Sequence, residues 1–141
     1  MNSKMRNKLI GLLLLCCSME SNAAVTLPKI FTSNMVLQRD KEIKLWGWAD
    51  KGETITVSFN GQSVKTKADK NGNWILTLKP MTHGGPFQMK IAGKKNIIDL
   101  ANILIGDVYI CSGQSNMEWV ISNTNNAEKE IAESKYPQIR L

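Results

Sequence analysis

Short segments in which apolar and polar residues alternate, separated by turn sequences, occupy residues 25–105. Alternation with a period of two places every second side chain on the same face of a β-strand. It is strict over residues 54–59, where three apolar residues share one face. The Asn60-Gly61 pair that follows favours a hairpin, because both residues tolerate the positive φ angles of a type I′ turn. This pattern predicts a β-rich fold and excludes a helical bundle.

The same pattern predicts about seven strands, with turn signals roughly every 8 to 12 residues. They are expected at residues 34–38, 42–48, 54–59, 62–68, 74–78, 87–91 and 97–105. Such spacing is typical of an immunoglobulin-like antiparallel β-sandwich, in which two sheets share one core. Three strand tryptophans, Trp46, Trp48 and Trp74, are expected in the core or at a domain interface, with stacking on a sugar as the alternative.

The pattern changes after Gly106. Residues 107–111 are nearly all apolar, which is typical of a buried strand in a parallel sheet, and the single Cys111 is expected to be buried there. A turn at residues 112–116 and a helix at residues 126–136 should follow. Strand, turn and helix open an α/β domain. We therefore expect a β-sandwich at residues 24–105 and the truncated first unit of a second domain at residues 106–141.

Residues 1–23 have the pattern of a secretory signal peptide: a basic start, an apolar run at residues 9–15 and small residues at 21–23. The apolar run is too short to span a membrane. Lipid attachment at Cys16 or Cys17 is the alternative, and only this would tether the protein to a membrane. Both interpretations predict export, so the protein is expected to be secreted or periplasmic.

The charge distribution and the scarcity of metal-binding residues argue against nucleic-acid binding and against metal binding. Removing residues 1–23 lowers the net charge from +6 to +4, and the remaining charge is spread along the chain. A nucleic-acid interface would cluster it, so no nucleic-acid partner is expected. One histidine, the single cysteine beyond residue 23 and scattered acids do not form a metal site. We expect neither a metal nor a cofactor.

Ser115 is the candidate nucleophile, because it follows an apolar run at a turn of small residues. The turn does not match the G-x-S-x-G nucleophile elbow, since Met117 occupies the position of the second glycine. From these residues alone, a structural turn serine is favoured over a nucleophile. His83 is the only histidine. It lies in a loop without a nearby carboxylate in sequence before Asp99, so a solvated histidine is expected rather than a base for Ser115.

Five stretches resemble one family of carbohydrate esterases. The most specific is IGDVYICSGQSNMEW at residues 105–119. It is accompanied by LPKIF at residues 27–31, NMVLQR at 34–39, WGWA at 46–49 and the pair Gly52-Glu53. Together they resemble the amino-terminal part of the sialate O-acetylesterase family, which is related to the SGNH hydrolases.

This resemblance implies a flavodoxin-like SGNH esterase domain behind the β-sandwich. It implies that Ser115 is the nucleophile and that its backbone N–H is one oxyanion donor, with Gly113, Gln114 and Asn116 as candidate oxyanion or substrate-binding residues. The substrate would be an O-acetylated carbohydrate. The catalytic histidine would lie in later sequence blocks, within a missing carboxy-terminal esterase domain.

The chain is thus expected to be an inactive amino-terminal fragment of a carboxylic ester hydrolase. The alternative is a secreted β-sandwich without enzymatic activity, which serves as a carbohydrate-binding or packing module.

Overall fold

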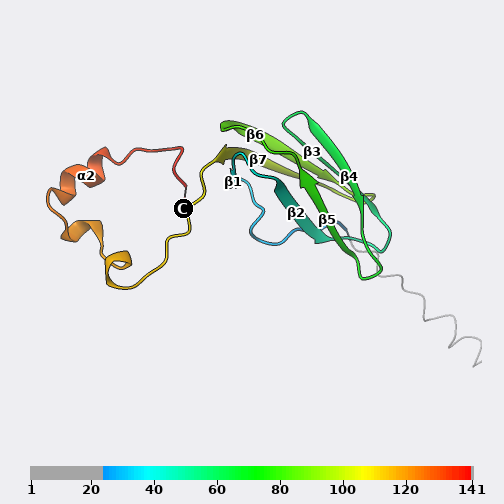
Figure 1. The fold of residues 1–141 in the computed structure, drawn as a ribbon, viewed down its shortest axis with the longest axis horizontal. Coiled ribbons are helices and arrows are strands. Elements are labelled where there is room, and N and C mark those ends of the chain that lie inside the picture. The colour runs from blue at the N-terminus through cyan, green and yellow to red at the C-terminus, as the bar shows by residue number, and fades with distance from the viewer. Residues whose placement is uncertain (1–23, 141) are drawn as a thin grey trace, which may run out of the picture.

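The structure, a computed structural model, describes residues 24–140 and is mainly β (Figure 1). The predicted signal peptide and the alternative lipid sites Cys16 and Cys17 lie outside the described residues. Seven strands are formed: β1 (Val36–Gln38), β2 (Ile43–Trp48), β3 (Thr54–Phe59), β4 (Gln62–Lys67), β5 (Asn73–Leu78), β6 (Gly84–Ala92) and β7 (Ile97–Gly106). The strands predicted from the alternation are confirmed, with shifts of a few residues at their ends.

The strands form a five-stranded sheet with the order β1-β7-β6-β3-β4 and a two-stranded sheet of β2 and β5. Consecutive strands β3 and β4 pair as a hairpin around the Asn60-Gly61 turn, as predicted. One pairing differs from the expected antiparallel arrangement: β1 runs parallel to β7, with Val36 opposite Leu104. The prediction of a purely antiparallel architecture is therefore wrong at this edge.

One hydrophobic core receives the inward side chains of both sheets. The three apolar residues of β3, Ile55, Val57 and Phe59, are at most 2% exposed. The ring of Phe59 contacts that of Phe87 from β6 edge to face, with centroids 5.9 Å apart. The alternation read from the sequence thus identifies the buried face of β3 correctly.

Side chains of β4 join the two sheets along one side. The Gln62 amide accepts a hydrogen bond from the Lys79 N–H at 2.8 Å and donates one to the Lys79 carbonyl at 3.2 Å. The Thr66 hydroxyl donates to the Ile75 carbonyl at 2.9 Å. These bonds satisfy polar backbone groups where no strand ladder does so.

The three strand tryptophans differ in their exposure to solvent. Trp74 is buried at 2% exposure, whereas Trp46 and Trp48 lie on the outside of β2 at 41% and 47%. Because side chains alternate along a strand and Ile43 and Leu45 point inward, the two tryptophans must point outward. Both residues are therefore outside the core, and packing at a domain interface or stacking on a sugar stays a prediction for them.

After β7 the chain runs away from the sheets and carries two 3-10 helices and one α-helix (Figure 1). These are η1 (Ser115–Met117), η2 (Ile121–Asn123) and α2 (Ala127–Glu133). The predicted helix is present but shorter than residues 126–136. The apolar side chains of Ile131, within α2, and of Tyr136, after it, are 51% and 65% exposed.

The predicted buried strand at residues 107–111 does not form in the structure. No strand pairs with it among residues 24–140, so Tyr109 and Ile110 remain 81% and 95% exposed. Cys111 is exposed as well, contrary to the expectation of burial. The apolar composition was read correctly, but burial requires neighbouring strands. Within residues 24–140, no helix is both long enough and apolar enough to cross a membrane.

Candidate active site

Ser115 lies at the start of η1 in an exposed turn. Its backbone φ is +28°, a region that non-glycine residues rarely occupy. The turn is closed by two hydrogen bonds, from the Met117 N–H to the Gln114 carbonyl at 3.0 Å and from the Glu118 N–H to the Ser115 carbonyl at 3.1 Å. Such unusual backbone conformations concentrate at active sites, although a turn alone does not define one.

The other three candidate residues surround Ser115 in the same turn. Gly113 has a φ of +158°, and a Cβ atom there would lie 2.9 Å from the Met117 side chain, so glycine suits this position. Gln114 is exposed, with an extended backbone and no side-chain capping bond to η1. Asn116 lies within η1. The turn therefore brings the sequence-predicted residues together only because they are adjacent in the chain.

His83 is exposed just before β6, and no hydrogen bond joins it to Ser115 among the described residues. The register of β6 and β7 pairs its neighbour Gly84 with Ile105, which brings His83 to the end of β7. The hydrogen bond from Arg39 is the main cause that lowers the pKa of the Asp107 carboxyl, and the charge of His83 lowers it further. A carboxylate therefore lies near His83 in space, although none was apparent in the sequence.

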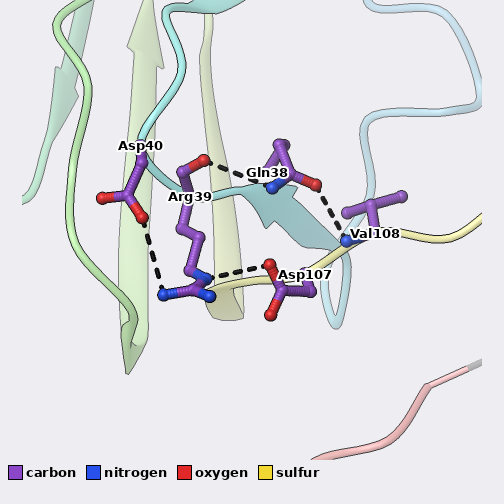
Figure 2. A network of polar contacts seen from close by, with 5 residues as sticks. All are labelled: Gln38, Arg39, Asp40, Asp107 and Val108. Carbon is purple, nitrogen blue, oxygen red and sulfur yellow. Dashed lines mark hydrogen bonds and ion pairs between the residues drawn. The ribbon is translucent and has the colours of Figure 1, made fainter.

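A network of polar contacts fixes the chain where it leaves β7 (Figure 2). The Arg39 Nε donates to Asp107 Oδ1 at 2.9 Å, and the Val108 N–H donates to the Gln38 side-chain oxygen at 2.9 Å. Arg39 also forms a longer ion pair with Asp40, at 3.5 Å. The last residue of β1 and the residue that follows it thus hold the first two residues of the segment that carries Ser115.

The other end of this segment returns to the same edge of the five-stranded sheet. The Arg140 guanidinium donates to the side-chain oxygen of Asn102 at 2.9 Å, to the backbone carbonyl of Asn102, and to the Met35 carbonyl at 3.4 Å. Residues 107–140 therefore form a long segment outside the sheets, and both of its ends are bonded to residues beside or within β1 and β7.

The hydrogen bond and charge of Arg39 lower the pKa of the Asp107 carboxyl, and Asp107 raises that of Arg39. We expect Arg39→Ala to raise the Asp107 pKa towards its ordinary value of 3.8, as followed by NMR titration of the carboxyl carbon. Lys90→Ala is the control, because Lys90 is another exposed cation and its ammonium lies 3.8 Å from a carboxylate oxygen of Asp99. This variant should leave the Asp107 pKa unchanged. An Asp107 pKa that is the same in Arg39→Ala and the wild type would contradict the ion pair.

The same ion pair makes the stability of the fold depend on pH, and the direction of this dependence follows from the Asp107 pKa. Because the folded-state pKa of Asp107 is lowered, its stabilising effect is present above the ordinary aspartate pKa. It is lost as the pH falls through the folded-state pKa. Both side chains are more than 40% exposed, so solvent screens the pair and the effect on global stability is small.

Comparison with known proteins relates this arrangement to one group of enzymes. No protein-family model matches the sequence. The mouse (Mus musculus) sialate O-acetylesterase is 34% identical over 119 residues, covering 76% of this chain and 22% of the mouse protein. The human protein (Homo sapiens) of the same name is 33% identical over 124 residues, covering 77% and 23%. This chain is a homologue of the sialate O-acetylesterases. The homologue spans less than a quarter of the length of these relatives.

A solved structure supports the same relationship. The crystal structure of a carbohydrate acetylesterase from Xanthomonas citri matches the homologue with a TM-score of 0.76 and 33% identity. The match covers 82% of this chain and 26% of that protein. The fold of the homologue is thus found in the structure of a carbohydrate esterase.

The sequence did not predict the anchoring residues of this sialate O-acetylesterase homologue. Gln38 and Asp107 lie in predicted strands and Arg39 in a stretch that resembles the family, but no contact among them was predicted. Their contact depends on the parallel pairing of β1 with β7, about 70 residues apart in sequence. Within residues 24–140, no group of three or more His, Cys, Asp or Glu side chains could hold a metal ion.

Proposed function

We propose that this homologue carries the nucleophile of a secreted serine esterase that removes O-acetyl groups from sugars. The observation that carries the proposal is the homology to sialate O-acetylesterases and to a carbohydrate acetylesterase. The exposed Ser115 turn, with its unusual backbone, gives the proposal a site.

In the proposed reaction the Ser115 hydroxyl attacks the acetyl carbonyl carbon of the substrate while a base takes its proton. The oxyanion that forms is stabilised by hydrogen-bond donors, among them the Ser115 backbone N–H. The sugar leaves as an alcohol after receiving the proton, and acetyl-Ser115 remains. Water then hydrolyses this ester, releasing acetate and restoring the serine.

We assign the base to a histidine from a further part of the protein. His83 is the only histidine of the 141 residues, and it shares no hydrogen bond with Ser115 among the described residues. The chain corresponds to 22% of the mouse relative, which leaves room for the base and further oxyanion donors. The 141-residue chain by itself is then expected to be inactive.

The proposal includes a division into parts. Residues 24–105 would form an immunoglobulin-like sandwich, residues 106–141 the first unit of an SGNH domain, and residues 1–23 a cleaved signal. The exposure of Val108, Tyr109 and Ile110 supports this division, because an α/β domain would bury such an apolar run between neighbouring strands.

A hybrid enzyme tests the proposal. Residues 24–141 would replace the matching part of the mouse sialate O-acetylesterase, and acetate release from O-acetylated sialic acid would be measured. We expect the hybrid to hydrolyse the substrate and the 141-residue chain alone to show no activity above buffer. A correctly folded hybrid that binds the substrate without hydrolysing it would contradict the esterase assignment.

A further inference from the structure

The outer face of the two-stranded sheet presents side chains that the proposed esterase reaction does not use. Cross-strand pairing sets Lys44 opposite Thr77, Trp46 opposite Ile75, and Trp48 opposite Asn73. We call these six residues the tryptophan face. All six are exposed, so an aromatic centre lies between polar ends that can donate and accept hydrogen bonds.

The two tryptophans form a platform with a defined spacing. They are two residues apart on one strand, so their Cα atoms are separated by roughly 7 Å. The rings of Trp46 and Phe31 contact each other edge to face, with centroids 4.7 Å apart and planes at 76°. A ring fixed in this way loses little conformational freedom on binding. Flat rings of this kind can stack against the C–H face of a sugar ring.

Acidic side chains near the Trp48 end of this face are already engaged in bonds. Asp50 pairs with Lys95 at 2.8 Å, and Glu53 accepts the Asp50 N–H at 3.0 Å. Asp69 accepts the N–H groups of Asn73 and Asn71, which lower the pKa of its carboxyl. The charge of Asp50 is therefore balanced by Lys95, whereas the N–H bonds to Asp69 stabilise its charged form.

Lysines at the same end are exposed to solvent. Lys51 follows β2, Lys70 lies in the turn before β5, and Lys94 lies in the turn between β6 and β7. Lys44 adds a positive charge on the face itself. The surroundings of the tryptophans therefore attract an anionic partner.

The tryptophan face lies away from the Ser115 segment. Trp48 pairs with Thr26, and the neighbouring Val25 bonds to Asn96 in the β6–β7 turn. The Ser115 segment leaves from the opposite end of β7, a strand of 10 residues that is roughly 33 Å long. Figure 1 shows the segment and the β6–β7 turn at opposite ends of the sheet. The face is therefore separate from the candidate active site.

We propose that the tryptophan face binds an acidic carbohydrate, a glycan chain that bears a carboxylate. Sugar rings stack on Trp46 and Trp48, and the carboxylate lies near Lys44. The lysines of the turns at the Trp48 end add to the positive charge around the face. The choice of a carbohydrate over another anion rests on the proposed function, which makes sugars the substrate class. The face would hold the glycan without taking part in ester hydrolysis.

The test measures binding of 3′-sialyllactose and of uncharged lactose to the full 141-residue chain, by calorimetry and by NMR shifts of the indole N–H signals. We expect 3′-sialyllactose to bind more tightly, with an affinity that falls as salt is raised. The double variant Trp46→Ala/Trp48→Ala should lose about tenfold or more in affinity. Lys44→Met should remove much of the preference for the charged sugar.

Two controls keep the test specific. Trp119→Ala removes a tryptophan that is also exposed, but in the Ser115 segment, and this variant should bind normally. Ser115→Ala should also bind normally, so that a failure of the esterase proposal is distinguishable from a failure of this one. The proposal is overturned if neither sugar binds, if the folded double variant binds like the wild type, or if the face instead joins two copies of the chain.

Discussion

Replacing Ser115 with alanine should lower acetate release by the hybrid esterase by about 10³- to 10⁶-fold. The loss of a nucleophile removes the covalent route and leaves only binding and oxyanion stabilisation. Because Ser115 is exposed in a turn, its removal should leave the melting temperature of the hybrid within about 1–2 °C of the parent hybrid. Initial rates on O-acetylated sialic acid at saturating substrate measure the effect.

Ser112 provides a matched control for this prediction. It is an exposed serine of the same small-residue stretch, three positions before Ser115. Ser112→Ala should retain activity within a few-fold of the hybrid. Equal losses in the two variants would mean that the turn matters only as structure, and the nucleophile would have to be sought elsewhere.

The second large effect concerns the core. Phe59→Ala should lower the free energy of unfolding by about 3–5 kcal/mol. The Phe59 side chain is 2% exposed and contacts the Phe87 ring. Phe59 lies on β3, which pairs with both β4 and β6. Since small domains are stable by only about 5–15 kcal/mol, this variant should be near the limit of folding. Urea unfolding followed by circular dichroism measures the change.

Ile97→Ala serves as the control for the core variant. Ile97 is a strand residue as well, but its side chain is 57% exposed. Its truncation should change the free energy of unfolding by about 0.5 kcal/mol or less. If the two variants were equally stable, the assignment of Phe59 to the core would be wrong.

Local alternation was sufficient to predict the strands of this protein. The buried face of β3 follows from the spacing of Ile55, Val57 and Phe59, and the hairpin after it follows from Asn60-Gly61. These features depend on neighbours in sequence, which is why the sequence alone reveals them.

Features that depend on distant partners were not predicted. The apolar run at residues 107–111 was expected to be a buried strand, but burial requires partner strands that residues 24–140 do not supply. Trp46 and Trp48 were expected in the core or at a domain interface, and alternation along β2 excludes the core for both. The inward positions of β2 were instead taken by Ile43 and Leu45.

The candidate site was predictable only in part. Ser115, Gly113 and Gln114 were identified from one contiguous motif, and the structure adds the positive φ of Ser115. The anchoring of this segment by Gln38 and Arg39 could not be predicted, because it follows from the parallel pairing of β1 with β7.

The most direct test of the central claim is to identify the residue that becomes covalently modified. The hybrid esterase would be treated with a fluorophosphonate, a reagent that phosphonylates activated serines, and its peptides analysed by mass spectrometry. The account predicts a single stoichiometric adduct on Ser115 that is absent from Ser115→Ala and present in Ser112→Ala. An adduct on a different serine of an active hybrid would contradict it.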